Sequence, residues 1–294
     1  MSSKIEWTNE SWNIITGCKK FSAGCQNCYA ETMHKRLTAM GQAKYGEPFE
    51  KVVFHKSELN RDFGYKKKMV FVNSMSDTFH GDITDQQIKM ILKECGERKN
   101  QIFQILTKRA YRLPDFDYPP NVWLGVTVEN RDNLSRMNYL KKTNAKIKFL
   151  SIEPLLEDLG EFDLYGIDWV IVGGETGKNA RPMYMQWVQD IKRQCIIQNV
   201  SFFFKQWGEW TPAFMNLENK NTLQYRFRTD KGEQNLDFEE IKNRYKIKTW
   251  DFAHDKYLKD RFGECHSFIS IKTGKQKCGN LLNGTLYQEM PKID

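Results

Sequence analysis

The chain has 294 residues, a net charge of +8, seven cysteines and a mean hydropathy of −0.66. This length suits one large domain or one domain with an appendage, and no run approaches the roughly 18 apolar residues of a membrane helix. The first ten residues lack the apolar core of a secretory signal, so we expect a cytoplasmic protein with reduced thiols and no membrane partner.

Short apolar runs alternate with amphipathic stretches through the first two thirds of the chain. The runs predict strands at 11–16, 69–74, 102–107, 122–128, 147–152, 169–174 and 200–205. The amphipathic stretches predict helices at 29–40, 84–99, 133–142 and 184–198. Thr84 is a suitable N-cap for the second helix. Because the strands are apolar nearly throughout, they are typical of parallel strands that are buried on both faces.

This alternation predicts an α/β fold. Its sheet would be either an open doubly wound sheet or a full or partial (β/α) barrel. Polar residues stand at the carboxyl end of nearly every strand. They are Asn73, Ser74, Asp77, Thr107, Lys108, Arg109, Thr127, Glu129, Asn130, Ser151, Glu153, Glu175, Lys205 and Gln206. A barrel gathers all these ends around one mouth, whereas an open sheet gathers only those at its switch point, so we favour the barrel.

The pattern changes after residue 207. Segment 208–294 predicts loops and hairpins, with turn signals at Lys231-Gly232, Thr273-Gly274 and Asn283-Gly284. We therefore predict a barrel domain over 1–207 and an irregular, β-hairpin appendage over 208–294 that packs on it. Segment 41–68 is predicted as a long loop between the first two barrel units.

Three cysteines in the run TGCKKFSAGCQNCYAE carry the strongest chemical signal. Cys18, Cys25 and Cys28 are separated by six residues and then two, between the first strand and the first helix. Thiolates are the ligands that iron–sulfur clusters favour, and a four-iron cluster with three protein ligands leaves one iron open to a small molecule. A zinc site, with a fourth ligand such as His34, and plain thiols are the open alternatives.

The remaining four cysteines give weaker signals. Cys95 and Cys195 fall at apolar positions of predicted helices and are expected in the core. Cys265 and Cys278 are too far apart in the sequence for a compact metal site, although they remain candidates for a second metal.

The acids and glycines at the strand ends suit a cofactor. Gly173 and Gly174 would let a ligand approach the backbone, and Glu175 would accept from an ammonium or a ribose hydroxyl; the alternative is a tight turn. Asp77, Glu129 and Glu153 offer further carboxylates.

The cations and tryptophans suit a substrate. Lys108, Arg109 and Lys205 are able to hold a carboxylate or a phosphate. Trp207 and Trp210 either stack on a base or pack the appendage against the barrel.

Several runs together resemble a known family. They are IEWTNESWNIITGC, SAGCQNCYAE, VFVNSMSDTFH, FQILTKR, NVWLGVTVEN, FLSIEPLL, DWVIVGGETG, ARPM and FFFKQWG. Over about residues 5–210 the chain resembles a phage and prophage family of radical-SAM-like proteins of unknown function, distantly related to photoproduct lyases. The resemblance implies a barrel of radical-SAM type in which Cys18, Cys25 and Cys28 bind a 4Fe-4S cluster. Asn27 replaces the aromatic residue of the commonest cysteine loop, so Tyr29 is the candidate for stacking on adenine.

We therefore predict an enzyme that uses a 4Fe-4S cluster and S-adenosylmethionine to generate a 5′-deoxyadenosyl radical. The predicted cofactor-binding residues are Tyr29, Ser74, Asp77, Thr107, Glu129, Gly173, Gly174 and Glu175. Lys205 and Glu153 are the predicted catalytic residues. The basic charge and the resemblance favour nucleic acid or a nucleotide derivative as substrate, which the enzyme would modify or repair. The reaction would need an electron donor, and a protein partner is an open alternative.

Two further hypotheses belong to other classes. The first is a non-catalytic nucleic-acid-binding protein that is stabilised by a metal or a cluster. The second is a hydrolytic zinc barrel, which the small number of histidines disfavours, since only five are present and none forms a His-x-x-x-His motif.

Overall fold

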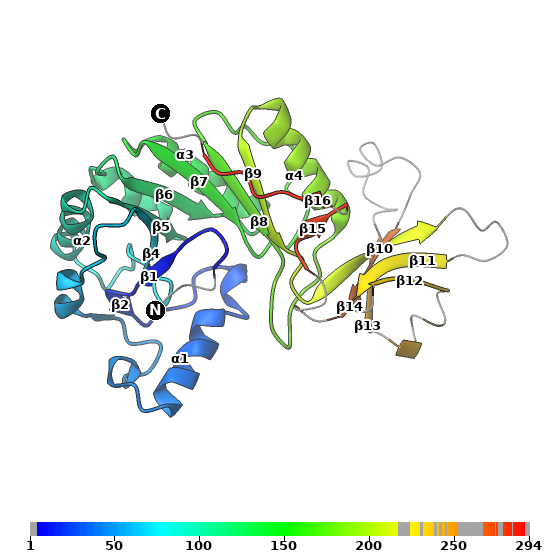
Figure 1. The fold of residues 1–294 in the computed structure, drawn as a ribbon, viewed down its shortest axis with the longest axis horizontal. Coiled ribbons are helices and arrows are strands. Elements are labelled where there is room, and N and C mark those ends of the chain that lie inside the picture. Colours follow the sequence, from blue (N-terminus) through cyan, green and yellow to red (C-terminus); the bar gives the residue numbers. More distant parts are fainter. Residues whose placement is uncertain are drawn as a thin grey trace.

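The computed structural model describes residues 5–216 together with shorter stretches of the last third. These stretches are 224–229, 232–237, 240, 243–244, 246–251, 267–273, 275, 279–283 and 285–291. A large parallel sheet and a smaller antiparallel sheet dominate the molecule, and the smaller one lies at the β9 end of the larger (Figure 1). No helix among the described residues is long and apolar enough to cross a membrane.

The large sheet holds seven parallel strands that lie in the order of the sequence. They are β1 (Glu10–Trp12), β4 (Lys68–Val72), β5 (Gln101–Thr107), β6 (Val122–Thr127), β7 (Ile147–Ile152), β8 (Trp169–Gly173) and β9 (Ser201–Gln206). In the described part of the chain, β1 and β9 do not pair with each other. The α/β fold is therefore a curled half-barrel, which confirms the predicted partial barrel (Figure 1).

Helices cover the convex face of this sheet. They are α2 (Asp85–Glu97), α3 (Arg136–Lys141) and α4 (Met185–Ile197), and all three bury apolar residues in one core with alternate strand residues. The predicted N-cap is confirmed, since Thr84 Oγ1 accepts from the Gln87 N–H and Gln87 Oε1 accepts from the Thr84 N–H. The predicted helix at 133–142 begins as a 3₁₀ turn, η5 (Arg131–Ser135), before α3.

Aromatic side chains fill the concave face. Trp7 lies across it, edge-on to Phe71 and Trp169 with ring centroids 4.8 and 6.2 Å apart. Phe149 and Phe203 join the same cluster. Because this packing occupies the middle of the half-barrel, the carboxyl ends of the strands are where polar residues gather.

The first predicted strand, at 11–16, is divided into two. After β1 the chain leaves the parallel sheet, and β2 (Ile15–Thr16) pairs antiparallel with β3 (Val53–Phe54). The cause is Asn13 between them, whose Oδ1 accepts from the Ser74 hydroxyl and so ties the turn to the end of β4. The predicted loop at 41–68 contains β3 and two 3₁₀ turns, η2 (Ala43–Tyr45) and η3 (Lys56–Asn60).

Helix α1 (Tyr29–Ala39) does not pack on the sheet. It projects from the body of the molecule (Figure 1), and its buried Ala30 packs with Tyr45, Phe49 and Met75. This small cluster also contacts Cys18 and Cys28, so α1 supports the cysteine run rather than the half-barrel.

The second sheet is antiparallel. Its strands are β10 (Trp210–Asn216), β11 (Gln224–Thr229), β12 (Gly232–Asp237), β13 (Lys246–Asp251) and β14 (Ser267–Lys272), in the order β12-β11-β10-β14-β13. A hairpin, β15 (Leu281–Leu282) and β16 (Thr285–Leu286), follows, with Asn283 at a φ of 51° in its two-residue turn. Lys231, Gly274 and Gly284 lie outside the described residues, and the predicted domain boundary after residue 207 stays a prediction.

The last described residues return to the half-barrel. The N–H of Phe204 donates to the carbonyl of Tyr287 at 2.8 Å, and the N–H of Glu289 donates to the carbonyl of Phe202 at 3.2 Å. Trp169 Nε1 also donates to the Glu289 carbonyl at 2.8 Å. The edge of β9 is therefore covered by residues 287–289.

Candidate metal centre

Cys18, Cys25 and Cys28 lie on the loop between β2 and α1, and all three are free, half-buried thiols. The loop begins at Gly17, whose φ is 79° and where a Cβ would lie 2.1 Å from the Lys51 carbonyl oxygen. Only glycine fits this position. The next N–H, of Cys18, donates to the Phe49 carbonyl at 2.7 Å. The start of the loop is thus fixed by backbone contacts and by the Ser76 hydroxyl, which donates to the Gly17 carbonyl.

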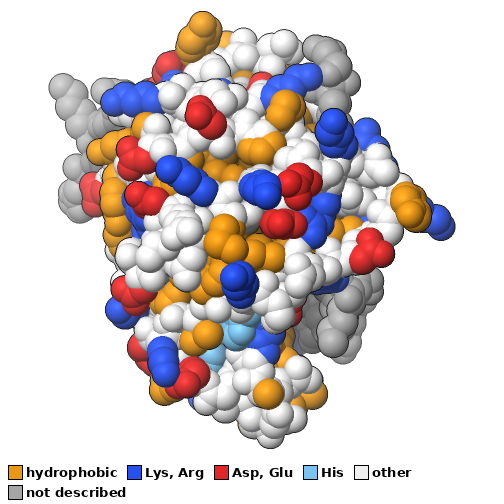
Figure 2. All heavy atoms as spheres, turned by 90° about the vertical axis from the view of Figure 1, so that its left-hand side faces the viewer, with side chains coloured by type: hydrophobic (Ala, Val, Ile, Leu, Met, Phe, Trp, Pro, Cys, Tyr) orange, Lys and Arg blue, Asp and Glu red, His pale blue; other side chains and the backbone are white. Residues whose placement is uncertain are grey.

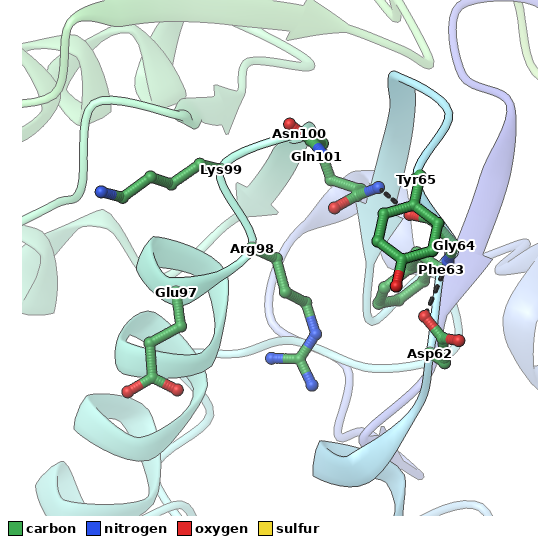
Figure 3. Close-up of a pocket in the computed structure, with 9 residues that line it drawn as sticks. All are labelled: Asp62, Phe63, Gly64, Tyr65, Glu97, Arg98, Lys99, Asn100 and Gln101. Atoms are coloured by element: carbon green, nitrogen blue, oxygen red, sulfur yellow. Dashed lines mark hydrogen bonds between the residues drawn. The ribbon is translucent and has the colours of Figure 1, made fainter.

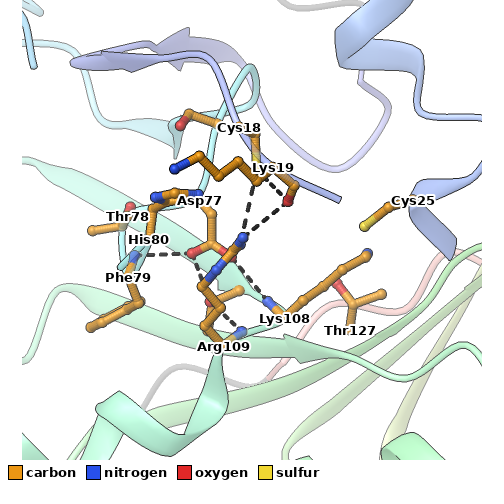
Figure 4. Close-up of polar contacts among 12 residues, drawn as sticks. Cys18, Lys19, Cys25, Asp77, Thr78, Phe79, His80, Lys108, Arg109 and Thr127 are labelled. Carbon is orange, nitrogen blue, oxygen red and sulfur yellow. Dashed lines mark hydrogen bonds and ion pairs between the residues drawn. The ribbon is translucent and has the colours of Figure 1, made fainter. Parts of the chain in front are cut away.

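The ends of β4 and β5 hold the first part of the loop through Asp77 and Arg109. Arg109 Nη1 lies 2.9 Å from Asp77 Oδ2 and 3.9 Å from Cys18 Sγ, and Nη2 donates to the Lys19 carbonyl at 3.0 Å (Figure 4). Burial and the Asp77 carboxylate raise the pKa of the Cys18 thiol to about 11, although Arg109 acts in the opposite direction. The free thiol is therefore protonated at neutral pH, and metal binding would release its proton.

The end of β6 holds the middle of the loop through Glu129, which is 0% exposed. Its Oε1 accepts from the Ser22 hydroxyl at 2.5 Å and lies 3.2 Å from Lys108 Nζ, while Oε2 lies 2.7 Å from Arg136 Nη1. Burial alone would raise the pKa of Glu129, but Lys108, Arg136 and Ser22 outweigh it, and the pKa is lowered. A Cβ at Gly24 would lie 2.6 Å from this carboxylate, so the loop rests directly on it.

The end of β8 holds the last part of the loop through Glu175. Its Oε2 accepts from Asn27 Nδ2 at 3.0 Å and from Arg181 Nε at 2.9 Å, and Arg181 Nη2 donates onward to the Ala23 carbonyl at 2.9 Å. Burial raises the pKa of Glu175, but the hydrogen bonds from Arg181 and Asn27 exceed this effect and the pKa is lowered. Four strand ends, those of β4, β5, β6 and β8, therefore hold one loop.

Most of the predicted cofactor-binding residues have partners within the protein. Thr107 Oγ1 donates to Asp77 Oδ1 at 2.7 Å, and the Ser74 carbonyl accepts from the Tyr29 hydroxyl. These contacts, and the bonds of Asp77, Glu129 and Glu175 described above, show that the predicted residues support the loop. That they also touch a cofactor stays a prediction.

Protein neighbours account for the two glycines after β8 as well. A Cβ at Gly173 would lie 3.1 Å from the Glu153 carboxyl carbon, and one at Gly174 would lie 2.1 Å from the Trp207 carbonyl oxygen. The Gly174 carbonyl accepts from Gln206 Nε2 at 2.8 Å. The close approach that these glycines permit is to their own chain, as the tight-turn alternative requires.

The ends of β7 and β9 form a second polar group, apart from the loop. Lys205 Nζ lies 2.8 Å from both carboxylate oxygens of Glu153, and Gln206 Nε2 donates to Oε1 at 3.2 Å. The side chains of Lys205 and Glu153 are 17% and 21% exposed. We call these three residues the Glu153–Lys205 group; the structure brings the two predicted catalytic residues into contact.

Tyr29 connects the loop with this group. The residue is 53% exposed, and its hydroxyl donates to the Ser74 carbonyl. Burial raises the pKa of Tyr29, and the neighbouring Cys28 thiol and Glu153 carboxylate raise it further. The hydroxyl thus lies close to a predicted cluster ligand and a predicted catalytic residue.

Several other expectations are resolved by the described contacts. Lys108 and Arg109 pair with Glu129 and Asp77, and that either also holds an anionic substrate stays a prediction. Trp207 and Trp210 are buried and donate to the carbonyls of Leu281 and Ala180, which favours packing over base stacking. Cys95 and Cys195 lie in the core as predicted, whereas Cys265 and Cys278 lie outside the described residues.

The sequence reasoning missed three supports of the loop, namely Ser22, Asn27 and Arg181. All three bond to predicted acids, at Glu129 or Glu175. Their only signal in the sequence was position: Ser22 and Asn27 stand between the cysteines, and Arg181 lies in the run ARPM.

The cysteine loop carries the soft donors that a cluster takes, and which metal it binds stays a prediction. Among the described residues, no group of three or more His, Cys, Asp or Glu side chains converges on one metal position. His34, the candidate fourth zinc ligand, faces elsewhere: its Nε2 bonds the Glu47 carbonyl at 2.8 Å, and its ring packs on Tyr45 and Phe49. In a cubane each thiolate binds a different iron, so three separate soft donors on one glycine-containing loop match that donor set.

A cavity of about 290 Å³ lies at the other end of the sheet. It is lined by residues of two segments, among them Asp62, Tyr65, Arg98 and Gln101 (Figure 3). Gln101 is the first residue of β5, so this cavity is at the amino end of the strands, away from the cysteine loop.

Fold and loop together define an α/β half-barrel protein with a three-cysteine loop at the carboxyl ends of its strands. The chain belongs to the family described as "Protein of unknown function (DUF5131)", whose model matches residues 2–291. Membership bears out the prediction only in that the family is one of unknown function; its radical-SAM-like character and phage association stay predictions. No curated protein matches the chain.

One solved structure shows a weak likeness. It is a spore photoproduct lyase mutant with bound AdoMet and dinucleoside spore photoproduct, at a TM-score of 0.37 and 11% identity, over 79% of this chain and 70% of that chain. A likeness of this strength says nothing about function.

Proposed function

We propose that this protein is a radical S-adenosylmethionine enzyme whose 4Fe-4S cluster is bound by Cys18, Cys25 and Cys28. The observation that carries the proposal is the loop itself: three free thiols at the carboxyl ends of a parallel half-barrel, held there by four strand ends. Enzymes built on parallel barrels place their chemistry at this end. A loop that served only to connect β2 and α1 would have no need of so many buried charges beneath it.

The chain's own residues would position and shelter the reaction. The cluster, when bound, supplies one electron for the reductive cleavage of S-adenosylmethionine. Glu129 and Glu175 bond Ser22 and Asn27 of the loop and would hold the three cysteines in place around the cluster. The aromatic packing around Trp7 closes the concave face beneath the site and excludes water from that side.

The Glu153–Lys205 group is the proposed contact with S-adenosylmethionine or substrate. It lies at the ends of β7 and β9, at the same end of the sheet as the strand ends that hold the loop. A partly exposed ion pair exchanges its internal partner for a ligand's charged group at small cost, because both arrangements keep every charge paired. Lys205 would then orient an anionic group and Glu153 a cationic or hydroxyl group.

The proposed substrate is nucleic acid or a nucleotide derivative. Support comes from the net charge of +8 and from the sequence resemblance. The charge is spread out on at least one side of the molecule: on the face in Figure 2, Lys and Arg side chains alternate with Asp and Glu among the atoms that are coloured. We therefore place substrate recognition near the loop rather than on that face.

The test is anaerobic purification with iron and sulfide analysis, followed by EPR of the reduced protein with and without S-adenosylmethionine. About four irons per chain and a spectrum that changes with S-adenosylmethionine are expected. Reduced protein should also form 5′-deoxyadenosine from S-adenosylmethionine.

Two variants sharpen the test. Cys25→Ala should lose both the cluster and the 5′-deoxyadenosine, whereas Cys195→Ala, which removes a thiol from the core, should keep both. Product from Cys25→Ala would refute the radical mechanism. Zinc in place of iron, or a cluster whose EPR spectrum does not change with S-adenosylmethionine, would favour the non-catalytic binding protein instead.

A further inference from the structure

The guanidinium of Arg109 contacts the sulfur of Cys18, which the proposed function makes a ligand of the cluster. Nη1 lies 3.9 Å from Cys18 Sγ. Three contacts fix the side chain there: Asp77 Oδ2 at 2.9 Å, the Lys19 carbonyl at 3.0 Å, and the ring of Phe21, whose centroid is 4.9 Å away. Arg109 is buried, so solvent and salt screen its charge weakly.

Asp77 acts on the same sulfur with the opposite sign. Its Oδ2 lies 2.9 Å from the Arg109 nitrogen that contacts Cys18 Sγ, and a carboxylate in this position disfavours added negative charge, whereas the guanidinium favours it. Asp77 is itself held by the Thr107 hydroxyl at 2.7 Å and the Phe79 N–H at 2.9 Å. A rigid pair of opposite charges therefore lies beside one predicted cluster ligand, and the cation is the member that touches the sulfur (Figure 4).

We propose that the Asp77–Arg109 pair sets the reduction potential of the cluster, with Arg109 raising the potential and Asp77 lowering it. This inference rests on the proposed function. On reduction, a low-potential one-electron donor adds one electron to the cluster; no bond or proton moves, and the cluster with its thiolates becomes one charge more negative. A cation and an N–H···S contact at Cys18 stabilise this added charge, and a neighbouring carboxylate destabilises it.

The experiment is an anaerobic redox titration of the full chain with its reconstituted cluster, followed by EPR. At the wild-type midpoint potential, Arg109→Gln is expected to lower the ratio of reduced to oxidised cluster about tenfold, which is about 59 mV for one electron. Asp77→Asn, which keeps a side-chain oxygen for Thr107, is expected to raise the ratio about threefold. The control Lys141→Gln removes a cation paired with Asp163 at the end of α3 and should leave the ratio within about twofold.

Opposite shifts in the two variants support the proposal, because general damage to the site would move both the same way. Equal signs, or a control shift as large as that of Arg109→Gln, overturn it. If Arg109→Gln does not fold, Arg109→Lys replaces it; its shorter side chain withdraws the charge from Cys18, so the ratio should fall about threefold, and an unchanged ratio overturns the proposal. A wild-type chain without a cluster refutes the proposed function as well, whereas a cluster with unmoved potentials refutes this inference alone.

Discussion

The cysteine loop and the Glu153–Lys205 group lie at the same end of the half-barrel, yet their charges are used differently. Beneath the loop, Glu129 is 0% exposed and bonds two cations, a hydroxyl and an amide. In the other group, Glu153 and Lys205 are about one fifth exposed and bond mainly each other. In the sequence, both regions appear simply as polar residues at the ends of predicted strands.

The difference separates supports from contacts. A buried carboxylate whose lone pairs are all occupied by its own protein has no capacity left for a ligand, and removing it leaves unpaired cations in the interior. A partly exposed pair has that capacity and contributes little to stability. We therefore expect substitutions beneath the loop to lower the free energy of unfolding and the metal content. Substitutions in the Glu153–Lys205 group should lower activity instead.

The largest effect is expected for Glu129→Ala. Loss of this carboxylate leaves Arg136 and Lys108 without their partner and frees Ser22, so stability should fall by about 3–5 kcal/mol. Urea unfolding of the metal-free chain measures the loss, and iron content after reconstitution should drop in parallel. Glu97→Ala, at an exposed pair with Lys93 on α2, is the control and should cost at most about 1 kcal/mol. If Glu129→Ala lowered the free energy of unfolding by so little, Glu129 would not be a support of the loop.

Gly174→Ala is expected to come next. The added Cβ would lie 2.1 Å from the Trp207 carbonyl oxygen, and such overpacking typically costs about 1–3 kcal/mol. Gly81→Ala, where a Cβ meets nothing within 4 Å, should be close to neutral in the same thermal or urea unfolding measurement. If Gly174 serves a ligand instead, stability will stay unchanged while S-adenosylmethionine binding falls.

Arg181→Ala should have an intermediate effect. It removes the bridge from Glu175 to the Ala23 carbonyl but leaves the Asn27 bond, so a loss of about 1–2 kcal/mol is expected. Release of iron to a chelator, followed by absorbance, should become several times faster. Arg193→Ala, at a half-exposed arginine of α4 that pairs with Asp190 and Glu161, provides the comparison. Equal release rates in the two variants would mean that the loop does not depend on Arg181.

The smallest effect on stability is expected for Glu153→Gln. Its free energy of unfolding should stay within about 1 kcal/mol of wild type, with full iron content. Formation of 5′-deoxyadenosine under reducing conditions should nevertheless fall at least about tenfold, which corresponds to about 1.4 kcal/mol of transition-state stabilisation. A large loss of stability together with intact product formation would place Glu153 among the supports.

Most of the fold was accessible from sequence patterns. The strand predicted at 147–152 has the observed bounds, and α2 was marked at its start by Thr84. These elements follow from local periodicity and capping, which depend only on neighbouring residues. The strand at 11–16 was predicted wrongly as continuous, because the side chain of Asn13 bonds to Ser74, about sixty residues away.

The site was accessible only in outline. The sequence places acids at strand ends and thiols on one loop, but the bonds between them join residues such as Ser22 and Glu129, which are 107 positions apart. Periodicity carries no information about such pairs. For this reason the acids were predicted as cofactor contacts, although Asp77, Glu129 and Glu175 are occupied by bonds within the chain.

The return of the chain to β9 has a consequence for the order of events during synthesis. Phe202 and Phe204 obtain part of their hydrogen bonding from Tyr287 and Glu289, so the half-barrel cannot cover its last edge until both sheets have been translated. A ribosome-bound or truncated chain that ends before Tyr287 would carry a bare, phenylalanine-rich edge strand, which is the kind of surface that recruits chaperones or other copies of itself.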